Sequence, residues 1–411
     1  MKGFTTKAIH GDLTEANPYG ALRGPVYQNI AFDFSSAEEL ENAFLGKTIS
    51  HSYSRISNPT NTELERKITY LTGGQGAIAV SSGMAAIANV ILALGKSGNN
   101  IIASNFSFGN TVSLIHETLK DWGLTVKTPD FHYPEEIEKE IDKNTSAIFL
   151  ETISNPQLAV FDIEKIGKIA EKYKIPLVLD NTAATPYLFQ AKKYGVSVEV
   201  LSAAKYISGG GVSIGGLIVD LGNFNWSLQP KMKDLYKKSG PFSFLVKLRR
   251  EVYRNLGACL APQNAFFQIL GLETLGLRIE KSSDNALALA RFFKSYPQVE
   301  GVNYPGLPES VYHENAKKIF NNCFGGILTF KLSDKAKCFQ FMNRLKIIRR
   351  ATNINDNKSL VIHPSSTIFC DFDEKKKKAL GVCDNLIRLS AGIEDLEDLK
   401  EDIDNALRES E

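Results

Sequence analysis

A single lysine stands where a strand-like segment meets a run of glycines. Lys205 lies in the segment LSAAKYISGGG, with small residues before it and Gly209, Gly210 and Gly211 after it. Glycine lets the backbone approach a neighbouring group closely, so we expect main chain to pack around this lysine. A partly desolvated lysine is neutral more of the time, and a neutral amine attacks carbonyl carbon. The segment therefore predicts a lysine used in covalent chemistry.

Two further strand-like runs of the same region end in polar or small residues. Asp180 ends the run PLVLD, and AIAVSS leads through Gly83 and Met84 into a helical pattern. A helix N-terminus offers N–H groups and a positive dipole end to a phosphate, although Ser-Gly there is also ordinary capping. An aspartate at a strand end is often a cap, but it can also hold a heterocyclic nitrogen protonated. Together with Lys205 these groups suit pyridoxal 5′-phosphate, bound to the lysine as a Schiff base.

Short apolar strands alternate with amphipathic helices between residues 61 and 255. The helical pattern TELERKITYLTG, for example, precedes strand patterns that include NIIASN, SAIFLET and PLVLDNT. This alternation is typical of an α/β fold with a mostly parallel sheet and helices on both faces. Ligands of such folds bind at the carboxyl ends of the strands, where Asp180 and Lys205 are expected to meet.

The regions on either side have different patterns. Residues 1–60 lack regular apolar periodicity, so we expect an arm that lies across another surface, such as a neighbouring subunit. Residues 256–411 begin with a long helical pattern and continue into strand patterns, FGGILTFKL and NLIRLSAGIEDLEDL. This order predicts a smaller C-terminal α+β domain beside the cofactor-binding domain of residues 61–255.

Composition excludes several classes of function. A net charge of +2 over 411 residues argues against a nucleic-acid or membrane partner, both of which usually need a concentrated basic face. Five scattered cysteines without a CxxC spacing argue against a disulfide framework and against a metal site such as zinc. The first residues carry no apolar run of signal-peptide length, so the cytoplasm is the expected location.

Six motifs in this order resemble the Cys/Met-metabolism family of fold type I pyridoxal-phosphate enzymes. They are YSRISNPT at 53–60, SSGMAA at 81–86, ETISNP at 151–156, DNTAATPY at 180–187, SAAKY at 202–206 and IRLSAGIED at 387–395. The match runs over nearly the whole chain. It implies Lys205 as the Schiff-base lysine, Asp180 as the partner of the pyridinium, and Gly83, Met84 and Ser202 around the phosphate.

The resemblance also implies roles for residues far from Lys205 in the sequence. Phe108 would stack on the cofactor ring and Asn155 would contact its hydroxyl. Tyr53 and Arg55 would reach the phosphate of the neighbouring subunit, as expected for the arm of residues 1–60. Arg388 would bind the α-carboxylate of the substrate, a task that suits a planar, bidentate guanidinium.

Three positions depart from the family pattern. Phe108 replaces the usual tyrosine, Ala204 the usual threonine before the lysine, and Gly210 a histidine of the glycine-rich stretch. These changes affect affinity for the cofactor and proton handling more than the fold. They leave open a regulatory protein that binds the cofactor with little turnover, although Lys205, Asp180 and Arg388 are all retained.

Within the family, the segment TNINDNKSLVIHPSST at 352–367 resembles the O-acetylhomoserine sulfhydrylases. The insert of residues 222–251 and LGACLAPQNAFFQILGLETL point the same way. The resemblance implies replacement of acetate by sulfide to give homocysteine in methionine biosynthesis, by a homo-oligomer, expected to be a tetramer. Ser359 is a candidate for substrate binding, whereas His363 is expected to be structural.

Several alternatives use the same site. Cystathionine γ-synthase, cystathionine γ-lyase and methionine γ-lyase activities need the same cofactor and the same carboxylate-binding arginine. The sulfur donor is also open, because a sulfur-carrier protein with a thiocarboxylate could replace free sulfide.

Overall fold

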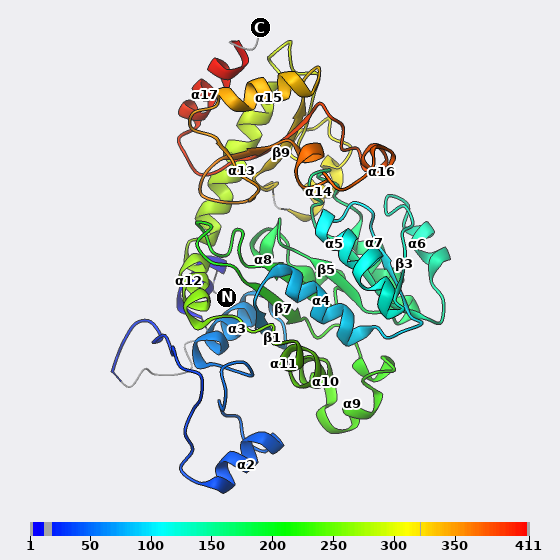
Figure 1. Ribbon diagram of the computed structural model, residues 1–411, viewed down its shortest axis with the longest axis vertical. Helices are drawn as coiled ribbons and strands as arrows, with labels where there is room; N and C mark the ends of the chain where they lie inside the picture. The colour runs from blue at the N-terminus through cyan, green and yellow to red at the C-terminus, as the bar shows by residue number, and fades with distance from the viewer. Residues whose placement is uncertain (1–2, 12–18, 321, 409–411) are drawn as a thin grey trace.

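A seven-stranded sheet forms the centre of the larger part of the molecule (Figure 1). The computed structural model describes residues 3–11, 19–320 and 322–408. The strand order is β1-β7-β6-β5-β4-β2-β3, in which β2 to β6 pair in parallel and β7 is antiparallel to both neighbours. The strands are β1 (Gly76–Val80), β2 (Asn100–Ala103), β3 (Thr125–Lys127), β4 (Thr145–Glu151), β5 (Leu177–Asp180), β6 (Val198–Ser202) and β7 (Gly216–Asp220).

Helices cover both faces of this sheet. Successive strand residues point to opposite sides, so each face presents apolar side chains to the helices that pack on it. In β4, Ile148 and Leu150 belong to a core that includes side chains of α3 (Pro59–Thr72), α7 (Ile163–Tyr173) and α12 (Pro262–Glu273). Ala147 and Phe149 belong to the opposite core, with α4 (Gly83–Leu94) and α10 (Ser243–Lys247). The α/β fold expected from the alternating pattern is therefore present.

Shorter helices complete this part of the molecule. They are α5 (Gly109–Ser113), the π-helix η1 (Leu114–Thr118), η2 (Lys120–Trp122), α6 (Pro134–Glu140), α8 (Thr185–Leu188), η3 (Ala191–Tyr194), η4 (Trp226–Leu228), α9 (Lys233–Ser239), η5 (Gly240–Phe242), the π-helix η6 (Leu248–Tyr253) and α11 (Arg254–Leu256). The segment TVSLIHETLKDWG, whose apolar spacing is that of one helix, is split into α, π and 3₁₀ segments.

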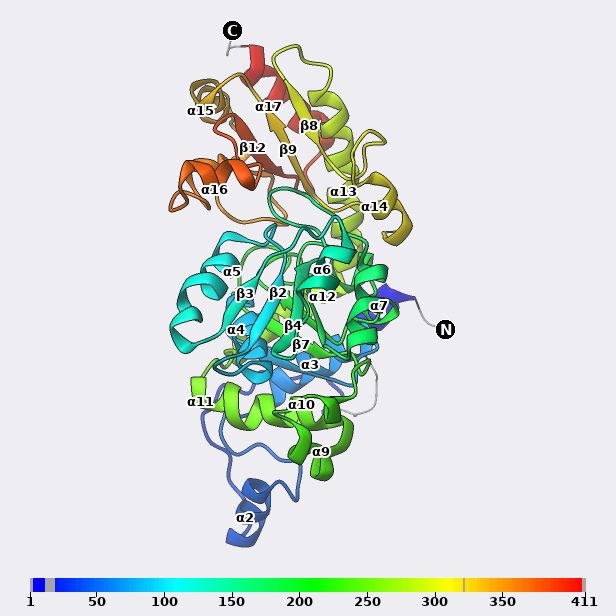
Figure 2. The same ribbon diagram turned by 90° about the vertical axis from the view of Figure 1, so that its right-hand side faces the viewer.

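A second sheet is formed by the part of the chain that follows the long helix α13 (Leu275–Phe293), and Figure 2 shows α13 beside this sheet. Its strand order is β10-β11-β12-β9-β8. The strands are β8 (Gly301–Asn303), β9 (Ile327–Lys331), β10 (Arg349–Arg350), β11 (Leu360–Ile362) and β12 (Leu386–Ser390), and the accompanying helices are α14 (His313–Ile319), α15 (Lys335–Arg344), η7 (Pro364–Ser366), α16 (Glu374–Ala379) and α17 (Leu396–Arg408). The division of the chain into an arm of residues 1–60 and domains of residues 61–255 and 256–411 stays a prediction.

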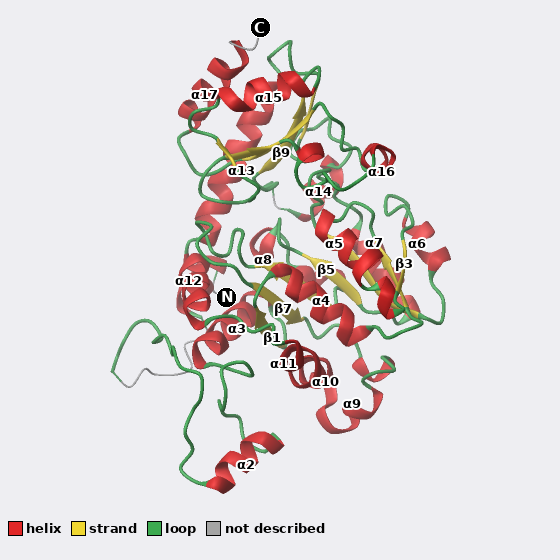
Figure 3. Ribbon diagram, in the orientation of Figure 1, coloured by secondary structure: helices red, strands yellow, loops and turns green. Residues whose placement is uncertain are grey.

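Part of the N-terminal arm extends away from both sheets (Figure 3). Helix α1 (Phe4–His10) packs on the body, where the ring of Phe4 lies 5.1 Å from that of Tyr187. Helix α2 (Ala37–Leu45), by contrast, has no buried residue in this chain. The arm contains these two short helices, which the missing periodicity did not predict.

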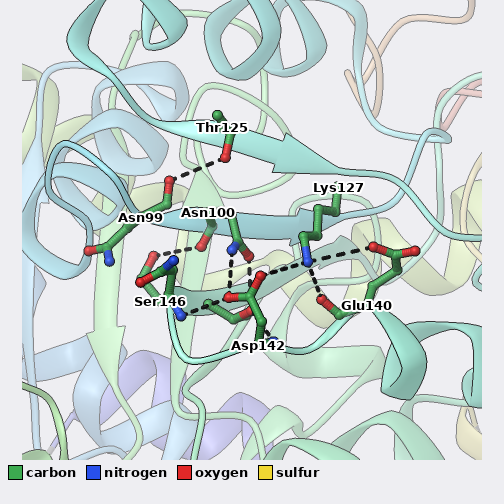
Figure 4. Close-up of polar contacts among 9 residues, drawn as sticks. Asn99, Asn100, Thr125, Lys127, Glu140, Asp142 and Ser146 are labelled. Atoms are coloured by element: carbon green, nitrogen blue, oxygen red, sulfur yellow. Dashed lines mark hydrogen bonds and ion pairs between the residues drawn. The ribbon is translucent and has the colours of Figure 1, made fainter.

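A polar cluster joins β2, β3 and the loop before β4 (Figure 4). Asp142 accepts hydrogen bonds from Asn100 Nδ2 at 2.9 Å and from Lys127 Nζ at 2.8 Å. These bonds and the amide of Asn144 lower the pKa of Asp142 to about 2. The cluster fixes the start of β2 relative to β4.

None of the helices in the described parts of the chain is long and apolar enough to cross a membrane.

Candidate active site

The carboxyl ends of β4, β5 and β6 bring the predicted residues to one edge of the sheet. Glu151, the last residue of β4, pairs with Asp180, the last residue of β5. Ser202 ends β6 opposite Gly216 of β7, and Lys205 follows in the next turn. Parallel pairing explains this convergence, because parallel strands all end at the same edge.

Asp180 is a buried carboxyl group whose negative charge a cationic ligand group would stabilise. Its Oδ1 accepts a hydrogen bond from the Thr182 amide at 2.9 Å. Burial raises the pKa of Asp180, and this effect outweighs the lowering by Thr182. The pKa of neighbouring Glu151 is raised well above its usual value, first by burial and then by the charge of Asp180. A protonated ring nitrogen beside Asp180 would offset the cost of its buried negative charge.

Lys205 has the properties expected of a reactive amine. Burial lowers its pKa to about 8, with a further contribution from the positive charge of Arg388. Its Nζ donates a hydrogen bond to Oδ1 of Asn353 at 2.6 Å. Asn353 in turn donates from Nδ2 to Asp356 at 3.0 Å, and the negative charge of Asp356 partly restores the pKa of Lys205. The amine is therefore oriented by a loop of the C-terminal region.

The N-terminus of α4 forms a narrow backbone cradle. The hydroxyl of Ser82 caps the helix by accepting from the Ala85 amide at 3.0 Å, so the two amides before it, those of Gly83 and Met84, begin the helix. A Cβ on Gly83 would lie 2.6 Å from Cβ of Ser202, and only glycine fits there. Helix-start amides beside a serine hydroxyl are groups that bind phosphate, so the residues present fit pyridoxal phosphate.

Arg388 is a buried cation that has no carboxylate partner among the residues that the structure describes. It lies on β12 with 1 % of its surface exposed, and burial lowers its pKa to about 9. Nη1 donates to Asn155 Oδ1 at 3.1 Å, and Nη2 donates to the carbonyl of Asn353 at 3.0 Å. Within the described residues its Nε has no hydrogen-bond partner. A ligand carboxylate would supply both the missing acceptor and the missing negative charge.

The structure shows contacts within the chain for the other sequence-predicted residues. Phe108 precedes α5, and its amide donates to Glu151 at 2.5 Å. Asn155 contacts Arg388 through its side chain, which adds to the expected contact with the ring hydroxyl. Ser359 is buried, and its hydroxyl bonds Glu394 and the Gly392 amide within the chain. The substrate role of Ser359 stays a prediction.

Tyr53 and Arg55 lie together on the arm. The guanidinium of Arg55 lies 5.3 Å from the ring centroid of Tyr53, and its Nη1 donates to the carbonyl of Arg254 at 2.7 Å. Both side chains are exposed in the single chain. Their predicted role in the site of a neighbouring subunit requires such exposure.

Asn353, Asp356 and Glu151 were not among the predicted site residues. The signal for the first two was their place in TNINDNKSLV, between the apolar strands of the C-terminal region. Asn355 of the same loop has a φ of 56°, and both polar atoms of its buried side chain lack partners in the part of the chain that the structure describes. The loop that contacts Lys205 through Asn353 therefore also carries buried hydrogen-bonding groups that the described residues leave unsatisfied.

Solved structures with the same fold define the class of the protein. A putative O-acetylhomoserine (thiol)-lyase of Campylobacter jejuni, with N′-pyridoxyl-lysine-5′-monophosphate at position 205, superposes with a TM-score of 0.93 at 38% identity, covering 99% of this chain and 100% of that one. An O-acetylhomoserine sulfhydrylase of Wolinella succinogenes, described with a novel mechanism of sulfur transfer, gives 0.78 at 47% identity over 86% and 98% of the two chains. The protein is a fold type I enzyme that depends on pyridoxal phosphate.

Within that class, the chain belongs to the Cys/Met metabolism PLP-dependent enzyme family, whose pattern matches residues 5–408. The homocysteine/cysteine synthase of Saccharomyces cerevisiae is 37% identical over 96% of this chain and 95% of its own. The O-acetyl-L-homoserine sulfhydrylase of Leptospira meyeri is 35% identical over 98% and 96%. The L-methionine gamma-lyase of Fusobacterium nucleatum is 35% identical over 98% of both chains. The relatives therefore share a family but differ in reaction.

Proposed function

We propose that this enzyme replaces the acetate of O-acetylhomoserine by sulfur and forms homocysteine. In this reaction the bond between Cγ and the ester oxygen breaks, a Cγ–S bond forms, and acetate leaves. The observation that carries the proposal is that Arg388, which is buried and has no carboxylate partner among the described residues, and the amine of Lys205 both bind Asn353. The sulfhydrylase names of several relatives support the choice of reaction.

Each residue of the site has a task in this proposal. Gly83, Met84 and Ser202 hold the phosphate of the cofactor, and Asp180 keeps its ring nitrogen protonated. When bound, pyridoxal phosphate supplies an electron sink for negative charge at the α- and β-carbons of the amino acid. Arg388 fixes the α-carboxylate of the substrate.

Lys205 is the proposed base. With a pKa of about 8, its Nζ is neutral in about a tenth of molecules at pH 7 and in about half at pH 8, and the neutral amine can take the proton from Cα. Asn353 holds that nitrogen in place through the 2.6 Å hydrogen bond. The positive charges of Lys205 and Arg388 repel, which favours the neutral amine until a substrate carboxylate binds the arginine.

The ester group of the substrate is inferred from charge. Between Ala351 and Pro364 the sequence carries one lysine, Lys358, and no arginine. A succinyl or phospho ester would bring an additional negative charge, and burying it without a partner costs several kcal/mol. An acetyl ester carries no such charge, so we propose O-acetylhomoserine as the preferred substrate.

The sulfur donor in the proposal is sulfide or a sulfur carrier that delivers it.

We also propose a homo-oligomer, a tetramer, in which Tyr53 and Arg55 complete the site of the next subunit. The exposed apolar side chains of the arm, which include Leu22, Phe44 and Ile49, support this assembly.

A γ-lyase is the second candidate, favoured by the relative named as an L-methionine gamma-lyase. Cystathionine γ-synthase is a third activity that the same site would serve. Product analysis separates them: the purified enzyme is incubated with O-acetyl-, O-succinyl- or O-phosphohomoserine and with sulfide or cysteine. Homocysteine from O-acetylhomoserine and sulfide supports the proposal, cystathionine identifies the synthase, and 2-oxobutanoate without a replacement product identifies a lyase.

A further inference from the structure

One buried carboxyl group lies beside three of the residues assigned to the cofactor ring. Glu151 ends β4 and pairs in register with Asp180, the last residue of β5. Its Oε1 accepts a hydrogen bond from the backbone amide of Phe108 at 2.5 Å. Burial raises the pKa of Glu151, and the backbone groups of Phe108 and Asn155 beside the carboxyl group partly lower it. Asp180, Phe108 and Asn155 are the predicted partners of the ring nitrogen, the ring face and the ring hydroxyl.

The backbone of Phe108 is held from two sides. Its carbonyl accepts hydrogen bonds from the amides of Thr111 at 2.8 Å and Val112 at 3.1 Å, within the start of α5. No side chain caps this short helix at Phe108. The amide of Phe108 is bound by Glu151, which belongs to the central sheet. Glu151 therefore links Phe108 directly to the sheet.

Glu151 is the neutral member of its pair with Asp180. Two carboxyl groups at adjacent strand ends repel each other when both are ionised, so one of them keeps its proton. The pKa of Glu151 is raised well above its usual value, first by burial and then by the charge of Asp180. The pKa of Asp180 is raised by burial but lowered by Thr182, and a cationic ring nitrogen would stabilise its charge further.

We propose that Glu151 is a positioning residue for the cofactor ring. As a neutral carboxylic acid it holds the backbone of Phe108, and so sets the aromatic side chain that is expected to stack on the ring. It leaves the negative charge of the site on Asp180. Two properties of Glu151 then matter, its reach from β4 to the Phe108 amide and its lack of charge. This role rests on the predicted stacking of Phe108 and is independent of the substrate proposed above.

Three substitutions separate reach from charge. Glu151→Gln keeps the length and an accepting oxygen and is neutral, Glu151→Asp keeps the acid but is one methylene shorter, and Glu151→Ala removes the group. Each apoenzyme is titrated with pyridoxal phosphate by equilibrium dialysis, and the visible circular dichroism of the bound cofactor is recorded. We expect Glu151→Gln to match the wild type. Glu151→Asp and Glu151→Ala should bind the cofactor about tenfold more weakly and change its dichroism.

A double-mutant cycle tests whether Glu151 acts through Phe108. Phe108→Ala alone should weaken cofactor binding and change the dichroism, which checks the stacking itself. Adding Glu151→Asp to Phe108→Ala should then have much less effect than Glu151→Asp has in the wild type. Full additivity of the two substitutions would overturn the proposal, and so would a Phe108→Ala variant with unchanged affinity and dichroism.

Asp220→Ala is the matched control for the loss of a buried carboxyl group. Asp220 ends β7 at the opposite edge of the sheet, where it pairs with Val198, and its carboxylate accepts hydrogen bonds from Gln75 and Trp226. We expect this variant to melt at a lower temperature with unchanged cofactor affinity and dichroism. Glu151→Asp that binds as tightly as the wild type, or Glu151→Gln that binds as weakly as Glu151→Ala, would contradict a neutral positioning group.

Discussion

Lys205 Nζ and Asn353 Oδ1 are joined by a hydrogen bond of 2.6 Å. The two residues are 148 positions apart, one after β6 of the large sheet and the other in the loop before β11 of the small sheet. The amine of Lys205 is therefore positioned by the C-terminal region. A change in that loop should alter the chemistry of Lys205 without changing the proposed phosphate cradle.

The first prediction concerns the titration of Lys205. Burial favours the neutral amine, so its pKa falls from 10.5 to about 8, and the amine becomes reactive at lower pH than in the unfolded chain. In the apoenzyme, the rate of acetylation of Lys205, followed by mass spectrometry of its peptide, should rise through a midpoint near pH 8. The same peptide in urea should show a midpoint near pH 10.5.

Two neighbours should move this midpoint in opposite directions. Asp356→Asn removes a negative charge that raises the pKa of Lys205, so the midpoint should fall. Arg388→Gln removes a positive charge that lowers it, so the midpoint should rise. Shifts of the same sign in both variants would contradict the electrostatic account.

The second prediction concerns the proposed phosphate cradle of Gly83, Met84 and Ser202. In Gly83→Ala the new methyl group would lie 2.6 Å from Cβ of Ser202, so the helix start must move away from β6. We expect the affinity for pyridoxal phosphate, measured by equilibrium dialysis, to fall at least about tenfold, or about 1.4 kcal/mol. Gly301→Ala places a methyl group in open space and serves as the control. Equal affinities in both variants would exclude this cradle.

The sequence allowed the edge of the large sheet to be predicted, but not the loop that faces it. Alternating strands and helices imply parallel pairing, and parallel pairing brings Asp180 and Lys205 to one edge. The contact of Asn353 with Lys205 depends on how two sheets pack, which no local pattern specifies. The π-helix η1 could not be predicted either, because the apolar spacing of TVSLIHETLKDWG fits a continuous α-helix.

The third prediction concerns recognition of the substrate carboxylate. Arg388→Gln keeps a hydrogen-bonding side chain but removes the charge, and hydrogen bonds to charged groups contribute about 1.5–3 kcal/mol each. We expect kcat/KM to fall about a hundredfold or more, mainly through KM, while the visible absorbance of bound cofactor is retained. Arg349→Gln, at an exposed arginine of β10, is the control. A loss in kcat alone would argue against carboxylate binding.

The fourth prediction concerns the arm. If Arg55 serves the neighbouring subunit, Arg55→Ala and Lys205→Ala chains are each inactive alone, but a hybrid contains one site with both groups intact. Co-refolded mixtures, separated by two different affinity tags, should regain activity. Hybrids with verified composition and bound cofactor that stay inactive would place Arg55 and Lys205 in the same chain's site or outside any site.

The most direct test of the proposed reaction compares two esters with sulfide as acceptor. We expect kcat/KM for O-acetylhomoserine to exceed that for O-succinylhomoserine by at least about tenfold, or about 1.4 kcal/mol of transition-state stabilisation. Homocysteine and acetate should form in equal amounts. Comparable turnover of the two esters, or cystathionine formed from cysteine faster than homocysteine from sulfide, would contradict the proposed function.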